Sequence, residues 1–261
     1  MAASVSAPSR GSRAPVRWAR AADEFVLTTI LLFGVVTVVR WLRDPDSALY
    51  IGDLDVALAV IGVISGTTVT ALMLTGPGRR SGGHLNPAVT VALWLMDVFP
   101  GRSVTPYVLA QLAGSVTGTA LGRLVWGPAV SVPQVAYVAI RPSPAWAPAS
   151  VFLAETGCVM ALMLVAGLVM TRPRQARLLP YVIGVSVALV IAILGPRSGG
   201  SINPARQFGP AAFAWQTTDL WIYMFAPILG AVLGAAVHGL LVRRLYNRRS
   251  FNEGVPPCES N

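Results

Sequence analysis

The tripeptide Asn-Pro-Ala occurs twice in this chain, as Asn86-Pro87-Ala88 and as Asn203-Pro204-Ala205. Asn is a favoured N-cap, and Pro fits the first helical position because no amide donor is needed there. A Gly-rich stretch precedes each tripeptide, and a short apolar stretch follows it. We therefore expect two short helices to begin in the same way, one at each Asn.

The composition places these helices in a membrane. Hydrophobic residues make up 54% of the chain and charged residues 12%, against roughly 25% charged residues in an average soluble domain. A helix that crosses the membrane needs about 20 apolar residues. Six apolar runs approach or exceed that length, at about 22–41, 55–75, 104–127, 149–170, 178–195 and 219–242. The sequence thus predicts an all-α integral membrane protein with six transmembrane helices, the first retained as an anchor.

The basic residues suggest how the helices are oriented. All 20 basic residues are Arg, and they give a net charge of +9. Fourteen flank the runs on one side, namely Arg10, Arg13, Arg17, Arg20, Arg79, Arg80, Arg102, Arg172, Arg174, Arg177, Arg243, Arg244, Arg248 and Arg249. The positive-inside rule then places both termini in the cytoplasm of a multi-pass protein of the cell (inner) membrane. Because the Arg clusters lie at helix ends, no nucleic-acid partner is expected.

The two halves of the chain repeat one order of elements. Each has two apolar runs, a Gly-rich loop, an Asn-Pro-Ala segment and a third run, in repeats of about 21–127 and 149–245. We expect one domain over 21–245, with disordered tails at 1–20 and 246–261. An odd number of crossings turns the second copy upside down, and in such inverted repeats discontinuous helices form sites near the membrane midplane.

The Asn-Pro-Ala segments are too short to cross the membrane. The stretches Asn86–Met96 and Asn203–Ala214 would form helices of roughly 16–18 Å at about 1.5 Å per residue. We expect two re-entrant half-helices that enter from opposite faces and meet with their N-termini at the midplane. Irregular backbone at that depth must be buried in protein or line a water-filled cavity, so the Gly-rich loops are expected to present carbonyl oxygens to polar molecules.

Two stretches carry a close resemblance to the aquaporin or major intrinsic protein family. They are Ser-Gly-Gly-His-Leu-Asn-Pro-Ala-Val-Thr at 81–90 and Gly-Pro-Arg-Ser-Gly-Gly-Ser-Ile-Asn-Pro-Ala-Arg-Gln-Phe-Gly-Pro at 195–210. The resemblance covers about residues 22–245. It implies a passive channel for water and small uncharged solutes, a homotetramer in the lipid bilayer with one pore in each subunit. No cofactor is expected, and Cys158 and Cys258 suggest neither a disulfide nor a metal site.

The pore would owe its selectivity to a few polar groups. Asn86 and Asn203 can donate side-chain N–H groups to a passing oxygen, while the positive ends of the two half-helices disfavour cations and protons. Arg206 is a permanent cation about one turn after Asn203 and resembles the constriction arginine of the family. The alternative for Arg206 is an interfacial residue whose head snorkels to water.

Other polar residues have structural interpretations. Glu24 and Glu155 could carry protons, because acids inside a membrane are often functional. The resemblance instead implies that both brace the re-entrant loops by accepting backbone hydrogen bonds. His84 is expected to be structural rather than a ligand or a switch, and Gln111 to be an amide that supports a loop.

Solute specificity depends on the constriction. Alignment on the half-helices predicts that Ile64, Ile191 and Gly200 complete a selectivity filter with Arg206, if Gly76–Arg80 holds about two more residues than is usual. Strict water pores of the family typically place Phe and His opposite the arginine, so the opening here is expected to be wider and less polar. Glycerol and metalloid hydroxides such as boric or arsenous acid then become candidate solutes. The pattern resembles nodulin-26-like channels and their bacterial relatives.

Three alternatives remain. The chain could be an orthodox water-selective aquaporin or a non-conducting structural member of the same fold, although the latter would be expected to have lost Arg206 or an Asn-Pro-Ala motif. It could also be an intramembrane serine protease that pairs Ser201 with His238. That last alternative gives Asn86 and the duplication no role.

Overall fold

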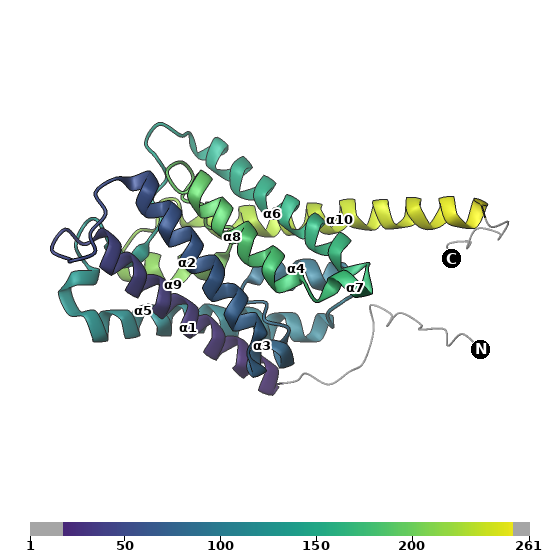
Figure 1. Ribbon diagram of the computed structural model, residues 1–261, viewed down its shortest axis with the longest axis horizontal. Helices are drawn as coiled ribbons and strands as arrows, with labels where there is room; N and C mark the ends of the chain where they lie inside the picture. Colours follow the sequence, from purple (N-terminus) through teal and green to yellow (C-terminus); the bar gives the residue numbers. More distant parts are fainter. Residues whose placement is uncertain (1–17, 253–261) are drawn as a thin grey trace.

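The computed structural model describes residues 18–252, with side chains described as far as Arg244. Within that range the chain is helical and contains no strand. Eight helices form its body (Figure 1), namely α1 (Trp18–Arg43), α2 (Leu54–Leu74), α4 (Pro87–Leu95), α5 (Val104–Trp126), α6 (Pro148–Met170), α8 (Leu179–Leu194), α9 (Pro204–Ala214) and α10 (Leu220–Asn252). The shorter elements are α3 (Gly76–Ser81), α7 (Pro173–Ala176), and the 3-10 turns Gly101–Ser103, Gly127–Val130 and Ala136–Val138.

All six predicted apolar runs form helices. Five helical stretches are long and apolar enough to cross a membrane, at Trp18–Arg43, Leu54–Leu74, Gly101–Val130, Pro148–Met170 and Leu220–Arg244. The sixth, α8, has 16 residues and is roughly 24 Å long. The half-helices α4 and α9 begin at Pro87 and Pro204, directly after the two Asn residues.

Both predicted tail boundaries differ from the structure. Helix α1 already begins at Trp18, and α10 continues to Asn252 rather than stopping at 245. The sequence of the extension, 246–252, contains no Gly or Pro, and the next such residue is Gly254, so no helix breaker ends the helix earlier. The predicted disorder at 1–17 and 253–261 lies outside the described residues.

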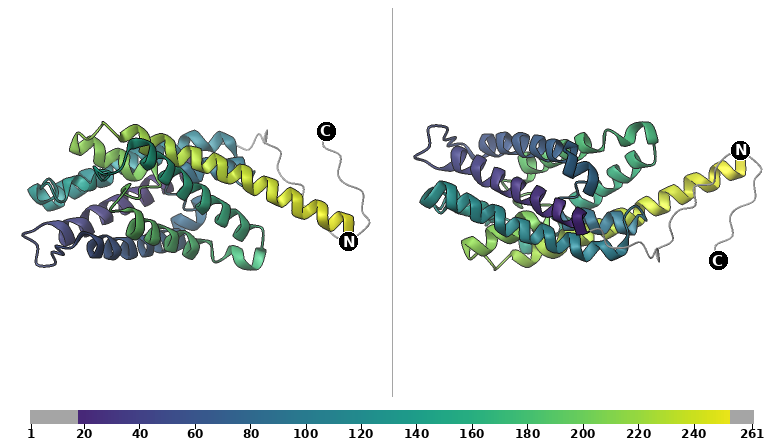
Figure 2. Two further views of the ribbon diagram at one scale, coloured as in Figure 1. Left: turned by 90° about the horizontal axis from the view of Figure 1, so that it is seen from above. Right: turned by 90° about the horizontal axis from the view of Figure 1, so that it is seen from below.

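The packing follows the predicted inverted repeat. Helix α1 packs along α5, α6 packs along α10, and α2 and α8 pack against each other. Each half-helix rests on a helix of the other repeat, since α4 contacts α10 and α9 contacts α5. In Figure 1, α4 lies in the half of the bundle near α3 and α7, and α9 lies in the opposite half. From two further sides, α10 extends beyond the rest of the bundle (Figure 2).

Glycines bring these helix pairs close together in both repeats. A Cβ at Gly118 of α5 would lie 2.5 Å from Thr29 O of α1, and one at Gly234 of α10 would lie 2.8 Å from Met160 O of α6. Side chains cannot be accommodated at such distances. The two pairs therefore use the backbone contact through small residues that is common among membrane helices.

The α2–α8 crossing is equally tight and supports a stability prediction. A Cβ at Gly66 would overlap Gly184 O, whereas a Cβ at Gly34 of α1 would have no neighbour within 4 Å. We expect Gly66→Ala to destabilise the protein by about 1–3 kcal/mol through overpacking. The matched Gly34→Ala should be neutral or slightly stabilising, because Ala favours helix over Gly by about 0.5–1 kcal/mol. Apparent melting temperatures in detergent would test this, and equal shifts for both variants would contradict the packing.

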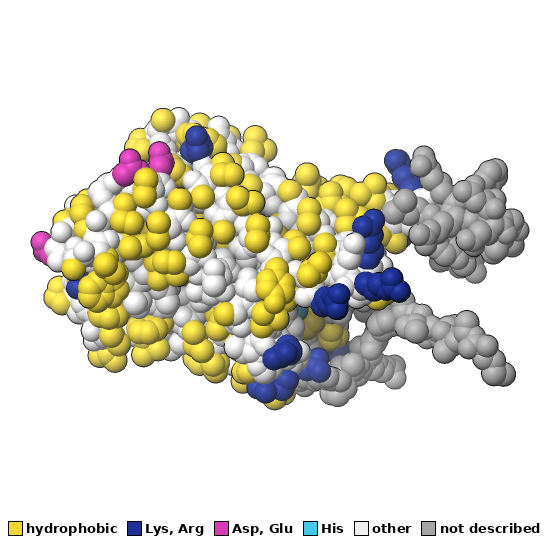
Figure 3. Space-filling view, in the orientation of Figure 1, with side chains coloured by type: hydrophobic (Ala, Val, Ile, Leu, Met, Phe, Trp, Pro, Cys, Tyr) yellow, Lys and Arg dark blue, Asp and Glu magenta, His cyan; other side chains and the backbone are white. Residues whose placement is uncertain are grey.

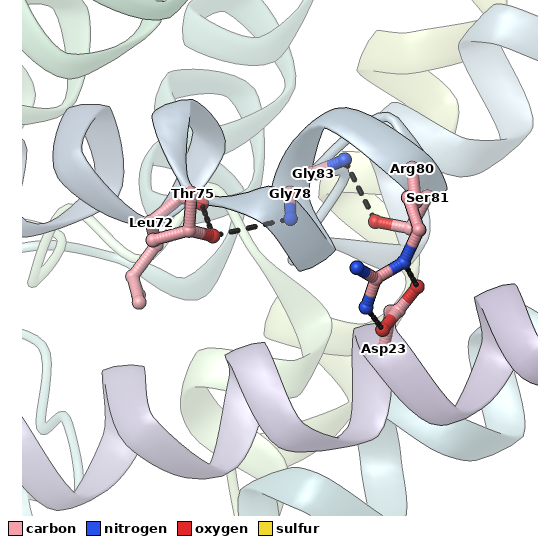
Figure 4. Close-up of polar contacts among 7 residues, drawn as sticks. All are labelled: Asp23, Leu72, Thr75, Gly78, Arg80, Ser81 and Gly83. Carbon is pink, nitrogen blue, oxygen red and sulfur yellow. Dashed lines mark hydrogen bonds and ion pairs between the residues drawn. The ribbon is translucent and has the colours of Figure 1, made fainter.

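The segment between α2 and the first half-helix is a fastened helical turn (Figure 4). Thr75 Oγ1 donates to Leu72 O at 2.6 Å and accepts from Gly78 N at 3.1 Å, so this residue both ends α2 and begins α3. Arg80 donates two hydrogen bonds to Asp23 of α1, at 3.2 and 2.7 Å. That hydrogen bonding and the carboxylate charge raise the pKa of Arg80 above its ordinary value. The residues at Gly76–Arg80 thus form an ordered turn attached to α1.

The surface agrees with a membrane setting. Figure 3 shows hydrophobic side chains spread over the whole visible face, with most of the visible Arg side chains at the end where α3 and α7 lie. Many of the most exposed large residues are apolar, including Leu124, Leu153 and Phe225. An apolar band with cations at one end is the distribution expected of a multi-pass membrane protein.

Candidate functional site

The two half-helices meet tip to tip through their Asn residues. Asn86 Oδ1 accepts from Ala88 N at 2.8 Å, and Asn203 Oδ1 accepts from Ala205 N at 2.9 Å, so each caps its own helix. Each side-chain amide also crosses to the opposite repeat. Asn86 Nδ2 donates to Ile202 O and Asn203 Nδ2 donates to Leu85 O, both at 2.9 Å. Because an amide nitrogen carries two N–H groups, one donor on each Asn is left over after this cross-link.

The loops before the half-helices share one backbone conformation. Both contain two glycines and one larger residue in the left-handed region, where glycine is favoured. The φ angles are 101°, 59° and 56° at Gly82, Gly83 and Leu85, and 91°, 60° and 46° at Gly199, Gly200 and Ile202. In each loop a serine stabilises the turn, since Ser81 Oγ accepts from Gly83 N at 3.0 Å and Ser198 Oγ accepts from Gly200 N at 3.2 Å.

Glu24 holds the first loop in place. Its carboxylate is fully buried and accepts from His84 N at 2.9 Å and Leu85 N at 2.7 Å. Gln111 Nε2 donates to the same carboxylate at 2.8 Å and to Thr90 Oγ1 at 3.1 Å. The His84 ring also reaches the Thr90 hydroxyl, with Nδ1 3.1 Å from Oγ1. These are the contacts that a bracing carboxylate and a supporting amide would make.

Glu155 occupies the equivalent place in the second repeat. It is fully buried and accepts from Ser198 Oγ at 2.9 Å, Ser201 N at 3.1 Å and Ile202 N at 2.6 Å. In both repeats, therefore, the carboxylate accepts the backbone N–H groups of the two residues directly before the half-helix Asn. Their common geometry favours bracing over proton transfer.

The bracing geometry gives a second stability prediction. Glu155→Gln replaces one acceptor oxygen with a donor, which leaves at least one buried loop N–H or O–H without a partner. Such a loss is worth about 1–3 kcal/mol, so we expect a lower apparent melting temperature in detergent. Asp55→Asn, at an exposed acid in the first turn of α2, is the control. A proton-carrying Glu155 would instead show reduced proton flux with unchanged stability.

A cavity of about 620 Å³ lies beside the meeting point of the half-helices. It is lined by residues from both repeats and from the loop after α5, and its wall is largely aliphatic. Of the residues expected at the pore, the structure brings His84, Asn86, Ile191, Gly200, Asn203 and Arg206 to this cavity. Glu24, Glu155 and Gln111 lie behind the loops rather than on the cavity wall.

Ile64 does not belong to this wall, contrary to the filter assignment from sequence. Its side chain is 37% exposed, and the α2 residues that line the cavity are Leu54, Leu58, Ile61, Ser65 and Val69. A Cβ at Gly62 would lie 3.4 Å from the Ile191 Cβ, so Ile61 is at the level of Ile191. The α2 residue that lines the cavity at this level, Ile61, is therefore three positions before the predicted Ile64.

Arg206 faces the cavity and is held by a loop that sequence reasoning did not identify. Its Nη1 donates to Val138 O at 2.6 Å. Val138 follows Ala136 and Tyr137 in a run with φ of 42°, 54° and 60°, which is rare for residues other than glycine. No turn motif in the sequence signals this run. A guanidinium that lines the cavity and is hydrogen-bonded within the protein favours the constriction interpretation over a snorkelling side chain.

Ser201 and His238, the two residues that the protease alternative pairs, bond and pack elsewhere. Ser201 Oγ donates to Asn203 O at 3.0 Å. The His238 ring packs on Gly167 of α6, where an added Cβ would lie 2.9 Å from the His238 Cγ. Among residues 18–244, no hydrogen bond connects the serine with the histidine.

Half-helices joined tip to tip beside a cavity inside a bundle of membrane helices define a channel. The chain belongs to the major intrinsic protein family, whose model, "Major intrinsic protein", matches residues 12–238. Its members are channels rather than enzymes, for water, glycerol and other small solutes.

Individual relatives and one solved structure agree with this assignment. The chain is 33% identical to a probable aquaporin, NIP7-1, of Arabidopsis thaliana over 91% of this chain and 78% of that protein. It is 34% identical to the propanediol uptake facilitator PduF of Citrobacter freundii over 75% of this chain and 84% of that protein. The structure of the aquaglyceroporin from Plasmodium falciparum matches with a TM-score of 0.76 and 21% identity, covering 88% of this chain and 99% of that one. The predicted fold of six transmembrane helices and two half-helices is thereby confirmed.

Proposed function

We propose that this protein is a passive channel whose outer constriction admits small uncharged polyols and metalloid hydroxides as well as water. The observation that carries the proposal is the aliphatic wall of the cavity that Arg206 also lines. There Ile61 and Ile191 present aliphatic surface, and Gly200 presents no side chain at all. A solute with a carbon backbone on one side and hydroxyls on the other can lie against the isoleucines while its oxygens accept from the guanidinium.

A narrow, polar constriction would act differently. It would select water by excluding larger molecules sterically and by leaving the carbon face of a polyol against polar groups. An aliphatic wall removes the cost of placing the carbon face of a polyol against polar groups, because it has no polar group that must lose its hydrogen-bond partners. The name of one relative, a propanediol uptake facilitator, supports a small diol as a solute of this chain too.

Charge selectivity would come from two levels of the same path. Arg206 places a permanent positive charge at the outer constriction. Deeper in the cavity, the N-termini of α4 and α9 meet at Asn86 and Asn203, and their dipoles add positive potential. A cation or a hydrated proton meets repulsion at both points, whereas a neutral hydroxyl can accept from the spare amide donors.

The assembly and setting follow from the family resemblance and the charge pattern. We propose a homotetramer in the cell membrane, with a pore in each subunit and both termini in the cytoplasm. The Arg side chains over α3 and α7 in Figure 3 support that orientation. Chemical cross-linking in vesicles and protease access to tagged termini would test these two proposals.

Stopped-flow light scattering on proteoliposomes tests the solute proposal. Osmotic water flux would be compared with the influx of glycerol, 1,2-propanediol, urea and boric acid, against protein-free vesicles. We expect solute influx well above the lipid background. Water flux with all solutes excluded would identify an orthodox aquaporin, and the absence of every flux would identify a non-conducting member of the family.

A further inference from the structure

We propose that Gln207 is a positioning residue that sets solute specificity by fixing the outer loop against Arg206. This inference rests on the proposed channel function. Gln207 follows Arg206 in α9 but does not line the cavity. Its side chain is almost fully buried, with 1% exposure, and points to the rear of the loop that forms part of the cavity wall.

The amide of Gln207 pairs with a single residue of that loop. Its Oε1 accepts from Ile140 N at 2.9 Å, and its Nε2 donates to Ile140 O at 3.1 Å. Both backbone groups of one residue are thus bound by one side chain. An amide is suited to this pairing because it carries a donor and an acceptor side by side. We call this pair of hydrogen bonds between Gln207 and Ile140 the clamp. The same Oε1 lies 3.4 Å from Arg206 Nη1, which links the clamp to the proposed constriction.

The clamped loop has an unfavourable backbone just before Ile140. Tyr137 and Val138 have φ of 54° and 60°, in a region that large or β-branched residues avoid. Backbone strain of this kind persists only when surrounding contacts hold it. The Arg206 bond to Val138 O and the Gln207 pair at Ile140 are two such contacts. Neighbouring residues of α9 thus hold the C-terminal side of the strained stretch.

The side chain of Ile140 links the clamp to the filter loop. A Cβ added at Gly199 would overlap Ile140 Cγ2, so the isoleucine fills the space that glycine leaves free. Gly199 directly precedes Gly200 of the proposed filter. Further along the loop, Ser143 N donates to Arg197 O at 2.7 Å. Gln207 therefore determines where Val138 O, Ile140 and the Gly199–Gly200 backbone stand relative to one another.

Loss of the clamp should widen the set of accepted solutes. Without the Gln207 pair, the strained stretch can relax, and Arg206 loses the carbonyl that orients it. The distance between the guanidinium and the aliphatic wall would then vary among molecules. An opening whose width varies discriminates less between a small polyol and a larger one. Water flux should change little, because water is smaller than either polyol.

The test variant is Gln207→Met, which keeps the length of the side chain and removes both hydrogen bonds. Gln216→Met is the matched control, because the Gln216 amide atoms are buried without a hydrogen-bond partner among the described side chains. Gln207→Glu is a second variant in case the first fails to fold. It keeps an acceptor for Ile140 N, loses the donor to Ile140 O, and borders a cavity of about 410 Å³ that is also lined by Arg141 and Asp219.

Two readouts are needed. The first is the ratio of glycerol to erythritol influx in proteoliposomes, normalised to water flux in the same preparation. The second is hydrogen exchange at the Ile140 amide, followed by mass spectrometry of the full-length protein. We expect Gln207→Met to lower the flux ratio several-fold and to speed exchange at Ile140, with Gln207→Glu intermediate and Gln216→Met like the wild type.

Faster exchange with an unchanged flux ratio would overturn the inference, since Gln207 would then only support the loop. Unchanged exchange would overturn the clamp itself. Failure of the proposed function is recognised separately, because it appears as absent solute influx in the wild-type protein, while the exchange measurement needs no flux.

Discussion

Arg206→Val is expected to raise proton and cation flux through the channel by about tenfold or more. At an effective dielectric constant of about 20, two unit charges 4 Å apart repel by about 4 kcal/mol. A change of ~1.4 kcal/mol already alters an equilibrium tenfold. The positive ends of α4 and α9 remain in the variant and oppose part of the increase. Flux of uncharged solutes should persist, because valine leaves the aliphatic wall intact.

The measurement for Arg206→Val is dye-reported proton flux in proteoliposomes under a potassium diffusion potential. Arg197→Val is the matched control. The Arg197 guanidinium donates to Ile193 O at the exposed outer end of α8, and Arg197 does not line the cavity. Proton flux that stays at the wild-type level in both variants would show that Arg206 takes no part in charge exclusion.

Ile191→Phe is expected to reduce glycerol influx several-fold while reducing water flux much less. Ile191 and Arg206 line the same cavity, and a phenyl ring at position 191 is expected to narrow the opening below the width of a polyol before it blocks water. Gly200 is a poorer place for such a test. Its φ is 60°, and a Cβ there would lie 2.9 Å from Val190 O, so any larger residue would strain the loop.

Stopped-flow influx of glycerol and water would be measured for Ile191→Phe side by side with Ile193→Phe. Ile193 lies on the same helix, and its side chain is 58% exposed and absent from the cavity wall. The control should match the wild type. Equal loss of glycerol and water flux in Ile191→Phe would mean that this residue does not form the selective constriction.

Local chemistry explains which features could be predicted from the sequence. The capping preference of Asn and the place of Pro at the first helical position predicted the starts of α4 and α9, and the structure begins both helices at those prolines. The family resemblance implied that Glu24 and Glu155 brace the re-entrant loops, and each accepts the backbone N–H groups of its own loop.

Features that depend on long-range geometry were not predictable in the same way. The assignment of Ile64, which was wrong, depended on counting residues across Gly76–Arg80, where the chain forms the helix α3. Nothing in the residue types at Ala136–Val138 predicts three consecutive left-handed residues. Arg206 and Gln207, which are distant in the sequence, contact this loop, so the loop and its carbonyl could be found only in the structure.

The most direct measurement combines two fluxes in one preparation. Proteoliposomes that contain a pH-sensitive dye would be mixed with glycerol, and swelling and proton flux would be recorded on the same vesicles. We predict glycerol influx well above that of protein-free vesicles, with proton flux at their background level. Glycerol influx at the background level, or proton flux that rises together with it, would contradict a channel selective for uncharged solutes.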